Sequence, residues 1–440
     1  MKLPFRLFIM ALVLVMTIVA CVPASAPAAE EAAPSAEAAA AASTGEKIQV
    51  RFWYGLGGEL GEVIEEMIKQ YNASQDAIEV TGVFQQSYNG VQEKFQAALV
   101  SGDVPEIVQI EIHGTPKFAS AGALTELQPF IDADPDLNFE DLIPAGMLNQ
   151  TWDGKLYAMP INRSTPVLYL NKQMFEAAGV EPPTTWQEFR AVAKTFTTGE
   201  GDAKVYGFLA TPSWWYFESM VWSNGGEIMN EELTQLTFAE PGAAPLQIWA
   251  DMIYQDGTAR VFTGDQSFAQ RNQAFAEGKG AMTFDSTAGL RGILAAIDGK
   301  FEIQTVFVPH MEGFNTAVPT GGAAAGIPAA VSDEKKQAAW EFIKWWISTE
   351  QNAYWSQETG YWPVRYSSVE KLRTEKYYEK NPAFETTIKQ LEFAKAAPST
   401  PYWPVISKAI GTAIEDVLVN NTPAIDALKK AEADAQAEIE

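Results

Sequence analysis

The feature that most constrains the fold is an alternation of extended and helical patterns directly after residue 46. Ile48 to Tyr54 is rich in strand-forming residues, and apolar residues then recur at helical spacing from Leu60 to Tyr71. Residues 77–85 and 105–112 repeat the strand pattern on either side of a second amphipathic stretch. This βαβαβ order predicts an α/β fold with a parallel sheet and helices on both faces.

Ligands of such sheets bind at the carboxyl ends of the strands, which directs attention to loops 55–59, 86–90 and 111–115. The first loop, "GLGGELG" from Gly55, is close to a dinucleotide-binding fingerprint. Leu60 stands where that fingerprint requires its third glycine. We therefore expect no nucleotide cofactor.

The N-terminus predicts an export signal. Lys2 and Arg6 precede an apolar run that is too short to span a bilayer and suits a signal peptide, here residues 1–20. The only cysteine, Cys21, has no disulfide partner, and the four residues that end with it resemble a bacterial lipobox. We expect Cys21 to carry lipid, including palmitate-type acyl chains, although an ordinary signal peptide and an uncleaved anchor helix remain alternatives.

Residues 21–45 are an Ala-, Pro- and Glu-rich stretch that predicts a flexible tether. The expected location is the extracytoplasmic face of the bacterial cell membrane, which is the periplasmic side if there are two membranes. The formal net charge of −25 gives no electrostatic footprint for nucleic acid or anionic lipid. Contact with a membrane is expected through the lipid anchor alone.

Two passages predict that the chain crosses between two lobes. Residues 154–189 show a turn, an apolar strand, the polar group Asn162 to Thr165, another strand and then helices. Residues 301–313 form a strand that would cross back, and 319–350 show a glycine turn, a strand and an aromatic-rich helix. The aromatic residues of that helix are expected to be core.

Five stretches resemble family 1 extracellular solute-binding proteins of ABC transporters, in the order of that family. They are "FWYGLGGELGEVIEEMIKQYN", "SGDVPEIVQI", the passage 154–189, "FAEGKGAMTFDSTAGL" and "ETGYWPVR". The nearest likeness is to the branch that contains the glycerol-3-phosphate-binding component.

The resemblance implies a type II periplasmic-binding-protein-like fold. Each lobe would be a mainly parallel sheet flanked by helices, with the ligand in the cleft between the lobes. Lobe 1 would comprise residues 46–162 and 309–350, and lobe 2 residues 163–308 and 351–440. The implied partners are a small solute and the permease subunits of an ABC importer, and we expect a monomer.

The resemblance also implies five ligand contacts and a possible acidic one. The implied contacts are Tyr88, Ser164, Ser286 or Thr287, Gly322 and Tyr361, and an acidic one could be Glu111, whose register is off by one. The residues themselves add aromatic side chains in expected loops, because flat rings suit the C–H faces of a sugar. These are Tyr54, Trp214, Trp215, Trp362 and Trp403. The alternative is that such rings pin one loop to another.

The solute class follows from a missing arginine. The glycerol-3-phosphate binders have an Arg near the C-terminus, whereas the corresponding stretch 398–405, "PSTPYWPV", has none. A buried phosphate without that cation would be poorly stabilised, although Arg163 or Arg365 could substitute. We therefore expect a carbohydrate, with glycerol 3-phosphate or a glycerophosphodiester as the alternative.

Other classes of protein remain open at this stage. A secreted carbohydrate-active enzyme would need two carboxylates that flank the bond, and no pair stands out. A protein-binding adhesin is a further alternative. The two histidines, His113 and His310, are not at metal spacing, and surface or hinge roles are expected for both. Residues 132–141 partly match a calcium loop but lack its glycine and terminal glutamate, so no metal is expected.

Overall fold

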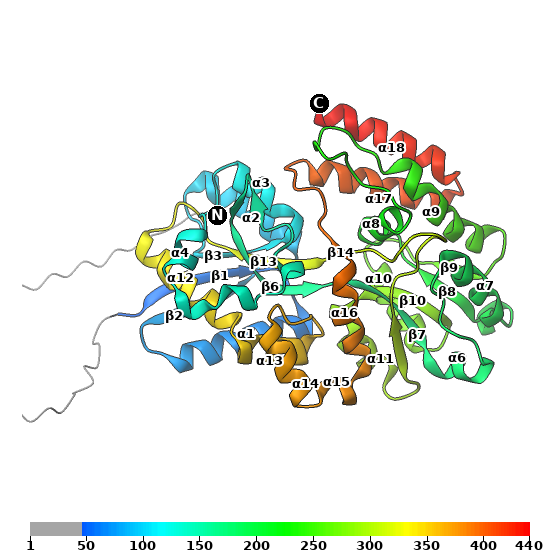
Figure 1. Ribbon diagram of the computed structural model, residues 1–440, viewed down its shortest axis with the longest axis horizontal. Coiled ribbons are helices and arrows are strands. Elements are labelled where there is room, and N and C mark those ends of the chain that lie inside the picture. Colours follow the sequence, from blue (N-terminus) through cyan, green and yellow to red (C-terminus); the bar gives the residue numbers. More distant parts are fainter. Residues whose placement is uncertain (1–45) are drawn as a thin grey trace, which may run out of the picture. The chain divides into compact units, whose positions relative to one another are not determined.

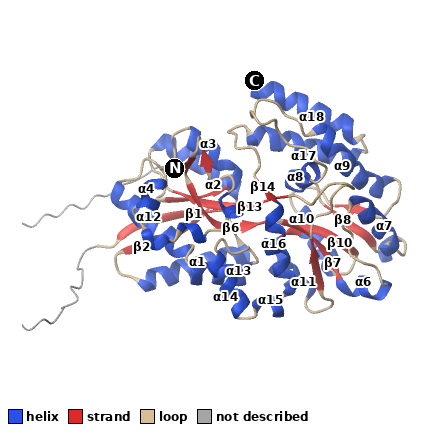
Figure 2. Cartoon of the chain, viewed as in Figure 1, coloured by secondary structure: helices blue, strands red, loops and turns tan. Residues whose placement is uncertain are grey.

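The computed structural model describes residues 46–440 of the chain. Two five-stranded sheets organise it, and helices lie along both (Figure 1, Figure 2). The first sheet has the order β2-β1-β3-β13-β6. Its strands are β1 (Ile48–Tyr54), β2 (Ile78–Phe84), β3 (Ile107–Glu111), β6 (Ala158–Ser164) and β13 (Gly321–Gly326).

The predicted βαβαβ unit is confirmed. Strand β1 pairs in parallel with β2 and with β3, and the connecting helices are α1 (Gly58–Ser74) and α2 (Tyr88–Ser101). Ser87 caps α2 by accepting a hydrogen bond from the backbone N–H of Gly90 at 3.0 Å. The helix ends at Gly102, whose left-handed φ of 81° suits glycine. The carboxyl ends of β1, β2 and β3 therefore meet at one edge, as expected.

The first sheet is mixed rather than mainly parallel. Strand β13 lies between β3 and β6 and runs antiparallel to both. Its register against β6 shifts between Ala323 and Ala324. Gly322 precedes this irregularity with a φ of +95°, and a Cβ there would lie 2.0 Å from the carbonyl oxygen of Asn162. Only glycine fits this position.

The second sheet has the order β11-β7-β10-β8-β9 and is also mixed, with β7 antiparallel to β10 and β11. Its strands are β7 (Pro166–Asn171), β8 (Tyr206–Ala210), β9 (Ala259–Val261), β10 (Gly280–Ser286) and β11 (Ile303–Val306). Thr165 alone separates β6 in the first sheet from β7 in the second (Figure 1). The chain thus passes from one sheet to the other inside the predicted passage 154–189.

The remaining elements surround the sheets. Short strands pair as β4 (Thr151–Trp152) with β5 (Lys155–Leu156), and β12 (Val318–Pro319) with β14 (Ala394–Lys395). The helices between β3 and β10 are α3 (Thr115–Ser120), α4 (Gln128–Asp132), α5 (Pro144–Met147), α6 (Lys172–Ala178), α7 (Trp186–Phe196), α8 (Trp214–Trp222), α9 (Ala239–Tyr254) and α10 (Ser267–Ala276). Those after β10 are α11 (Leu290–Ile297), α12 (Asp333–Trp346), α13 (Thr349–Thr359), α14 (Tyr366–Thr374), α15 (Tyr377–Lys380), α16 (Glu385–Gln390), α17 (Trp403–Asn420) and α18 (Ala424–Ile439).

Aromatic side chains build the core on both sides. Phe52 of β1 packs against Phe342 and Trp346 of α12, which confirms the aromatic helix 319–350 as core. Around the second sheet, Trp249 of α9 stacks on Phe284 of β10 with ring centroids 5.6 Å apart. Most of the indoles that the sequence supplies are therefore used for burial of apolar area.

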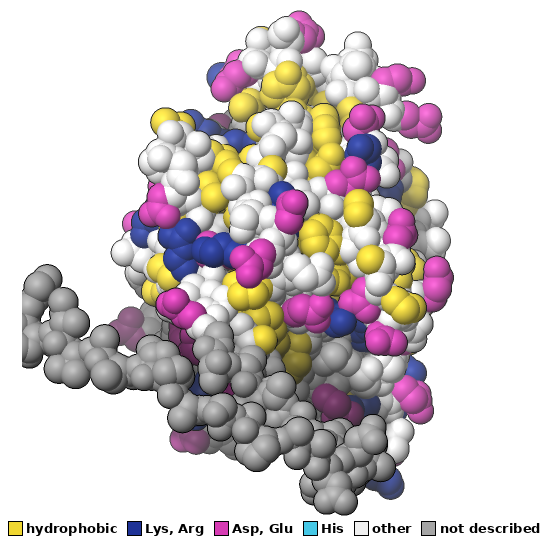
Figure 3. Space-filling model, turned by 90° about the vertical axis from the view of Figure 1, so that its left-hand side faces the viewer, with side chains coloured by type: hydrophobic (Ala, Val, Ile, Leu, Met, Phe, Trp, Pro, Cys, Tyr) yellow, Lys and Arg dark blue, Asp and Glu magenta, His cyan; other side chains and the backbone are white. Residues whose placement is uncertain are grey.

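Charged and apolar side chains are mixed on the surface. Figure 3 shows acidic and basic side chains interspersed among apolar ones on the side of the unit it faces. A search of residues 46–440 finds no helix with the length and apolar character needed to cross a membrane. The predicted signal peptide, Cys21 and the tether lie outside the described residues.

Candidate ligand-binding site

A cleft of about 910 Å³ lies where helices of the two sheets face one another. Its volume is in the range of small-molecule sites. One wall comes from the first sheet's side, through α2, the end of β3 and the start of α3. These lining residues are Ser87, Tyr88, Asn89, Gln92, Glu93, Gln96, Glu111, His113, Gly114 and Lys117.

The opposite wall comes from segments that flank the second sheet. Three helices begin there, α8 at Trp214, α10 at Ser267 and α17 at Trp403. The lining residues are Pro212, Ser213, Trp214, Thr263, Gly264, Ser267, Trp403, Pro404, Ser407, Lys408, Gly411, Thr412 and Glu415. Tyr88, Trp214 and Trp403 supply ring faces, and the remaining groups are mostly amides, hydroxyls, carboxylates and ammonium groups.

His113 joins the two walls, and the expected surface role for it is wrong because its side chain is 1% exposed. The ring Nδ1 lies 2.7 Å from Oε1 of Glu111, and the backbone N–H of His113 donates to Oε2 of Glu111 at 3.1 Å. The same ring stacks on Trp403 with centroids 4.7 Å apart and meets Trp214 edge-on at 5.2 Å. Its Nε2 lies 3.8 Å from Oε1 of the buried Glu218 in α8.

Burial and neighbouring charges shift the pKa values of His113 and Glu218 in opposite directions. Burial alone would lower the pKa of His113, but Glu111 and Glu218 raise it to about 9. Burial raises the pKa of Glu218, and its proximity to His113 opposes that rise. Both carboxylate oxygens of Glu218 are buried without a hydrogen-bond partner among the described residues, because 3.8 Å is too long for a hydrogen bond.

A chain of hydrogen bonds runs from the first strand loop to the cleft. Gln109 of β3 accepts from the backbone N–H of Gly55 at 2.8 Å and donates to Oδ1 of Asn162 at 3.0 Å. Asn162 donates to the hydroxyl of Tyr88 at 2.8 Å, and that hydroxyl lies 3.3 Å from the hydroxyl of Tyr361. Burial raises the pKa values of both tyrosines. The structure thus brings together Tyr88 and Tyr361, which are 273 residues apart in the sequence.

A second group of predicted residues lies where the chain crosses between the sheets. The indole N–H of Trp215 donates to the carbonyl of Thr320 at 3.3 Å. A Cβ at Gly321 would lie 2.5 Å from this indole and 2.9 Å from the hydroxyl of Ser164. Ser164 and Trp215 therefore contact the start of β13 and the residue before it rather than the 910 Å³ cleft.

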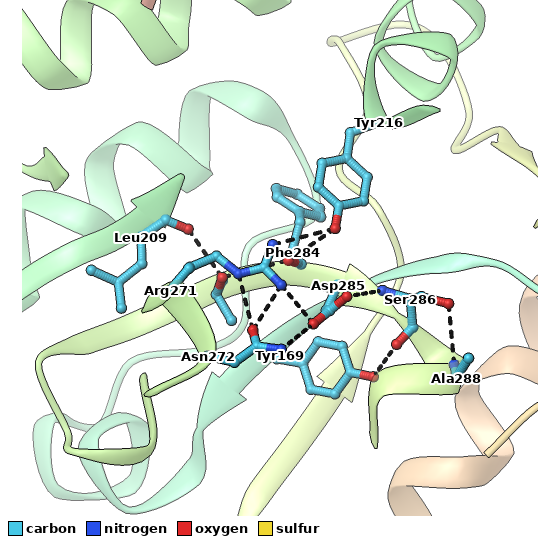
Figure 4. Close-up of polar contacts among 10 residues, drawn as sticks. Tyr169, Leu209, Tyr216, Arg271, Asn272, Phe284, Asp285, Ser286 and Ala288 are labelled. Carbon is cyan, nitrogen blue, oxygen red and sulfur yellow. Dashed lines mark hydrogen bonds and ion pairs between the residues drawn. The ribbon is translucent and has the colours of Figure 1, made fainter. Parts of the chain in front are cut away.

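Ser286 ends β10, Thr287 follows it, and both side chains hold the local backbone. The hydroxyl of Ser286 accepts from the N–H of Ala288 at 3.2 Å, and the hydroxyl of Thr287 accepts from the N–H of Thr165 at 3.3 Å. Figure 4 shows the neighbouring ion pair, in which Oδ2 of Asp285 accepts from Arg271 at 2.5 Å and from Asn272 at 2.7 Å. Asp285 is thereby saturated by protein donors.

Two predicted aromatic residues lie away from the cleft. Tyr54 is at the end of β1, where its hydroxyl donates to Glu65 at 2.5 Å, and it lines a separate hollow near Phe84. Trp362 is 2% exposed and packs beside Gly146. Of the twelve predicted ligand contacts, the cleft lining contains Tyr88, Glu111, Trp214 and Trp403.

The possible calcium loop has another structure. Asp134 is paired with Lys344 at 2.7 Å, and Asp141 with Arg365 at 3.2 Å. Between positions 46 and 440, no three His, Cys, Asp or Glu side chains are arranged to hold a metal ion. Asp134 and Asp141 therefore fasten this segment to α12 and to the segment after Trp362.

Several lining residues were not identified from the sequence. Lys408 and Glu415 lie on one face of α17, and Gln92 and Gln96 on one face of α2. The i, i+3/i+4 spacing of polar residues next to Tyr88 and Trp403 is the signal that could have indicated them. Nothing in the local sequence indicates the partnership of His113 with Glu218, because the two residues lie on different elements.

Comparison with solved structures gives the same architecture. UgpB from Mycobacterium tuberculosis, solved with glycerophosphocholine, is 26% identical with a TM-score of 0.78, over 90% of this chain and 99% of that one. The cyclic alpha-maltosyl-1,6-maltose binding protein of Arthrobacter globiformis is also 26% identical, with a TM-score of 0.74, over 89% and 99%. The expected α/β binding-protein fold is therefore confirmed.

Proteins related in sequence lead to the same kind of protein as the structural comparison. The sn-glycerol-3-phosphate-binding periplasmic protein UgpB of Yersinia pestis is 27% identical over 359 residues, 78% of this chain and 80% of that protein. The protein of the same name from Rhizobium meliloti is 29% identical over 363 residues, 78% of this chain and 81% of that one. The family described as bacterial extracellular solute-binding protein matches residues 66–386. This match extends over most of the chain, so the chain belongs to the family of bacterial extracellular solute-binding proteins, which are binding proteins rather than enzymes.

Proposed function

We propose that the chain captures a hydroxyl-rich solute, a carbohydrate or polyol, in the 910 Å³ cleft and delivers it to an ABC importer. The observation that carries the proposal is the composition of the lining. Tyr88 and Trp214 offer aromatic surface, while Glu93, Glu111 and Glu415 offer acceptors for hydroxyl groups. Flat apolar faces combined with fixed polar groups are what a sugar requires.

The two walls support a closure mechanism. We place residues 46–162 and 309–350 in lobe 1, and residues 163–308 and 351–440 in lobe 2. Helix α13 spans the boundary at residue 350 and packs on α1 of lobe 1. A solute in the cleft would contact both lobes, and so would stabilise the closed form over an open one. The permease would recognise the closed form.

A glycerophosphodiester or glycerol 3-phosphate is the second candidate. The names of the sequence relatives favour it, and Lys117 and Lys408 put two ammonium groups in the lining. Within the part of the chain that the structure describes, no arginine lines the cleft. Arg365 donates to Asp141 and to backbone carbonyls, and Arg163 is buried against Thr320. The bidentate arginine contact that stabilises a phosphate monoester is therefore supplied by neither.

The N-terminal expectations complete the proposal. Lipid on Cys21 and a tether through residue 45 would hold a monomeric binding unit near its permease outside the membrane. Metabolic labelling with a palmitate analogue tests this attachment. Label on the wild-type chain and none on Cys21→Ala is the expected result.

Solute class can be tested by calorimetry and thermal shift with maltose, maltotriose, ribitol, glycerol 3-phosphate and glycerophosphocholine. We expect saturable binding of a sugar or polyol, with the compound recovered intact. Tighter binding of glycerol 3-phosphate than of every sugar and polyol would overturn the preferred solute class. Turnover of a glycan would overturn the binding role itself.

A further inference from the structure

We propose that His113 is a positioning residue that couples closure of the lobes to the orientation of Glu111 in the cleft. This inference rests on the closure mechanism of the proposed function. It assigns a role to one of the chain's two histidines, which sits at the junction of the two walls.

On the lobe 1 side, His113 fixes the carboxylate. Glu111 ends β3 and lines the cleft with a side chain that is 20% exposed. Each of its oxygens accepts a hydrogen bond from His113, one from the ring at 2.7 Å and one from the backbone N–H at 3.1 Å. Two bonds from the same residue restrict both the rotamer and the plane of the carboxylate. The remaining lone pairs therefore point in a defined direction for a ligand hydroxyl.

On the lobe 2 side, three groups hold the other half of the ring. Trp403 of α17 stacks on it at 4.7 Å with an interplanar angle of 13°, and Trp214 of α8 meets it edge-on at 5.2 Å. An imidazolium over an indole face gains a cation–π attraction that is stronger when water is excluded. These contacts exist only while α8 and α17 face η1, the 3₁₀ turn Ile112–Gly114, across the junction.

Glu218 makes the coupling stronger. A buried carboxylate without hydrogen bonds is destabilising unless a cation is close, and Nε2 of His113 lies 3.8 Å away. Separation of the lobes would take His113 away from Glu218 and both indoles, while leaving Glu111 beside it. The ring would then turn more freely, and Glu111 would lose its fixed orientation.

Charged groups from several elements surround the ring. Glu111 comes from β3 and Glu218 from α8, while Lys117 of α3 and Lys408 and Glu415 of α17 lie along the same cleft. The two carboxylates nearest the ring are the groups that keep it protonated at neutral pH.

Nuclear magnetic resonance can follow the ring directly, because the chain has two histidines and His310 is a built-in reference. The ring Nδ1 of His310 lies 2.9 Å from the carbonyl of Met311, outside the cleft lining. With ring-labelled histidine, we expect saturation by whichever compound of the panel binds to shift the His113 signals and change its titration, with His310 unmoved. Bound compound with unchanged His113 signals and titration would overturn the inference.

Variants supply a second, independent readout. His113→Ala should weaken binding of the same compound by about 10-fold, because Glu111 then keeps only the bond from the backbone N–H and its carboxylate can rotate. His113→Asn keeps a donor near the Nδ1 position and should recover part of that loss, while His310→Ala should bind like wild type. Folding is checked by the thermal midpoint of each variant.

The outcomes separate the two proposals. Wild-type affinity in a folded His113→Ala variant, or no recovery in His113→Asn, would overturn the role of His113 and leave the solute-binding function standing. No binding of any panel compound by wild-type protein would overturn the proposed function, and this inference with it.

Discussion

The buried ion pair between Arg271 and Asp285 gives the most quantitative prediction. Arg271 is 0% exposed and Asp285 10%, and their charged atoms lie 2.5 Å apart (Figure 4). The Asp285→Asn substitution keeps the shape of the side chain but removes its charge. It leaves the Arg271 guanidinium, which also donates to the hydroxyl of Tyr216 at 3.3 Å, without an ionic partner.

Loss of one partner of a buried pair is destabilising by about 3–5 kcal/mol. The amide oxygen of asparagine can still accept one hydrogen bond, so the lower end, about 3 kcal/mol, is expected. The unfolding entropy near 60 °C is about 2.1 cal/mol/K per residue, or about 0.8 kcal/mol/K for a unit of roughly 400 residues. The melting temperature should therefore fall by about 4 °C, which scanning calorimetry resolves easily.

The exposed pair of Lys172 and Glu302 provides a matched control. Their charged atoms are also 2.5 Å apart, but the side chains are 39% and 67% exposed. Glu302→Gln should lower the melting temperature by less than about 1 °C, because solvent screens such pairs. If Asp285→Asn also changed it by less than about 1 °C, the argument that burial makes the ion pair essential would be refuted. A double change to Arg271→Met and Asp285→Leu should be less destabilising than Asp285→Asn alone.

Three further substitutions test the site and the framework. Gly322→Ala should destabilise the fold by more than about 2 kcal/mol in denaturant unfolding, because φ is +95° and the added Cβ would collide with the backbone of Asn162. An unfolding midpoint equal to that of wild type would contradict this. Tyr361→Phe removes the hydroxyl that lies 3.3 Å from the hydroxyl of Tyr88. Calorimetry should therefore show a solute affinity about 2- to 10-fold weaker than that of wild type. An equal affinity would count against a role for the chain of hydrogen bonds. Burial alone would raise the pKa of Glu106, but Lys335 at 2.7 Å and a second cation hold it below the ordinary 4.5. A carboxylate whose pKa is lowered by folding stabilises the fold at pH values above its ordinary pKa, and this stabilisation is lost as the pH falls. The difference in melting temperature between wild type and Glu106→Gln should therefore close below about pH 4. A constant difference from pH 3 to 7 would be inconsistent with the pairing.

The fold was predictable where the signal is local. The apolar spacing from Leu60 to Tyr71 and the glycine at 102 suffice to define α1 and the end of α2, because helical periodicity and a left-handed cap depend on neighbouring residues. The mixed pairing of the sheets was not predictable in this way. Strand β13 joins β3 from more than 200 residues away, and nothing in its sequence specifies the direction of its partner.

The aromatic predictions show a second limit. Proline and serine around Trp214 and Trp403 suggested loops, but both residues begin helices, α8 and α17. Serine before a helix and proline in its first turn are also N-terminal signals, so one composition fits both structures. Local context does not decide whether a ring lines the cleft either, because Trp362 lies in a similar Gly-Tyr-Trp-Pro context and is packed away from it.

The polar groups of the cleft favour one kind of solute. Helices α8 and α17 begin at the lining, so their N-terminal ends favour oxygen acceptors. Glu93, Glu111 and Glu415 line the same space and require donors. A hydroxyl group is both donor and acceptor and satisfies either kind of site. A phosphate dianion only accepts, and it would face these three carboxylates against the two ammonium groups of Lys117 and Lys408, in a chain of net charge −25. The number of hydroxyl donors in a solute, rather than its charge, should therefore rank the affinities.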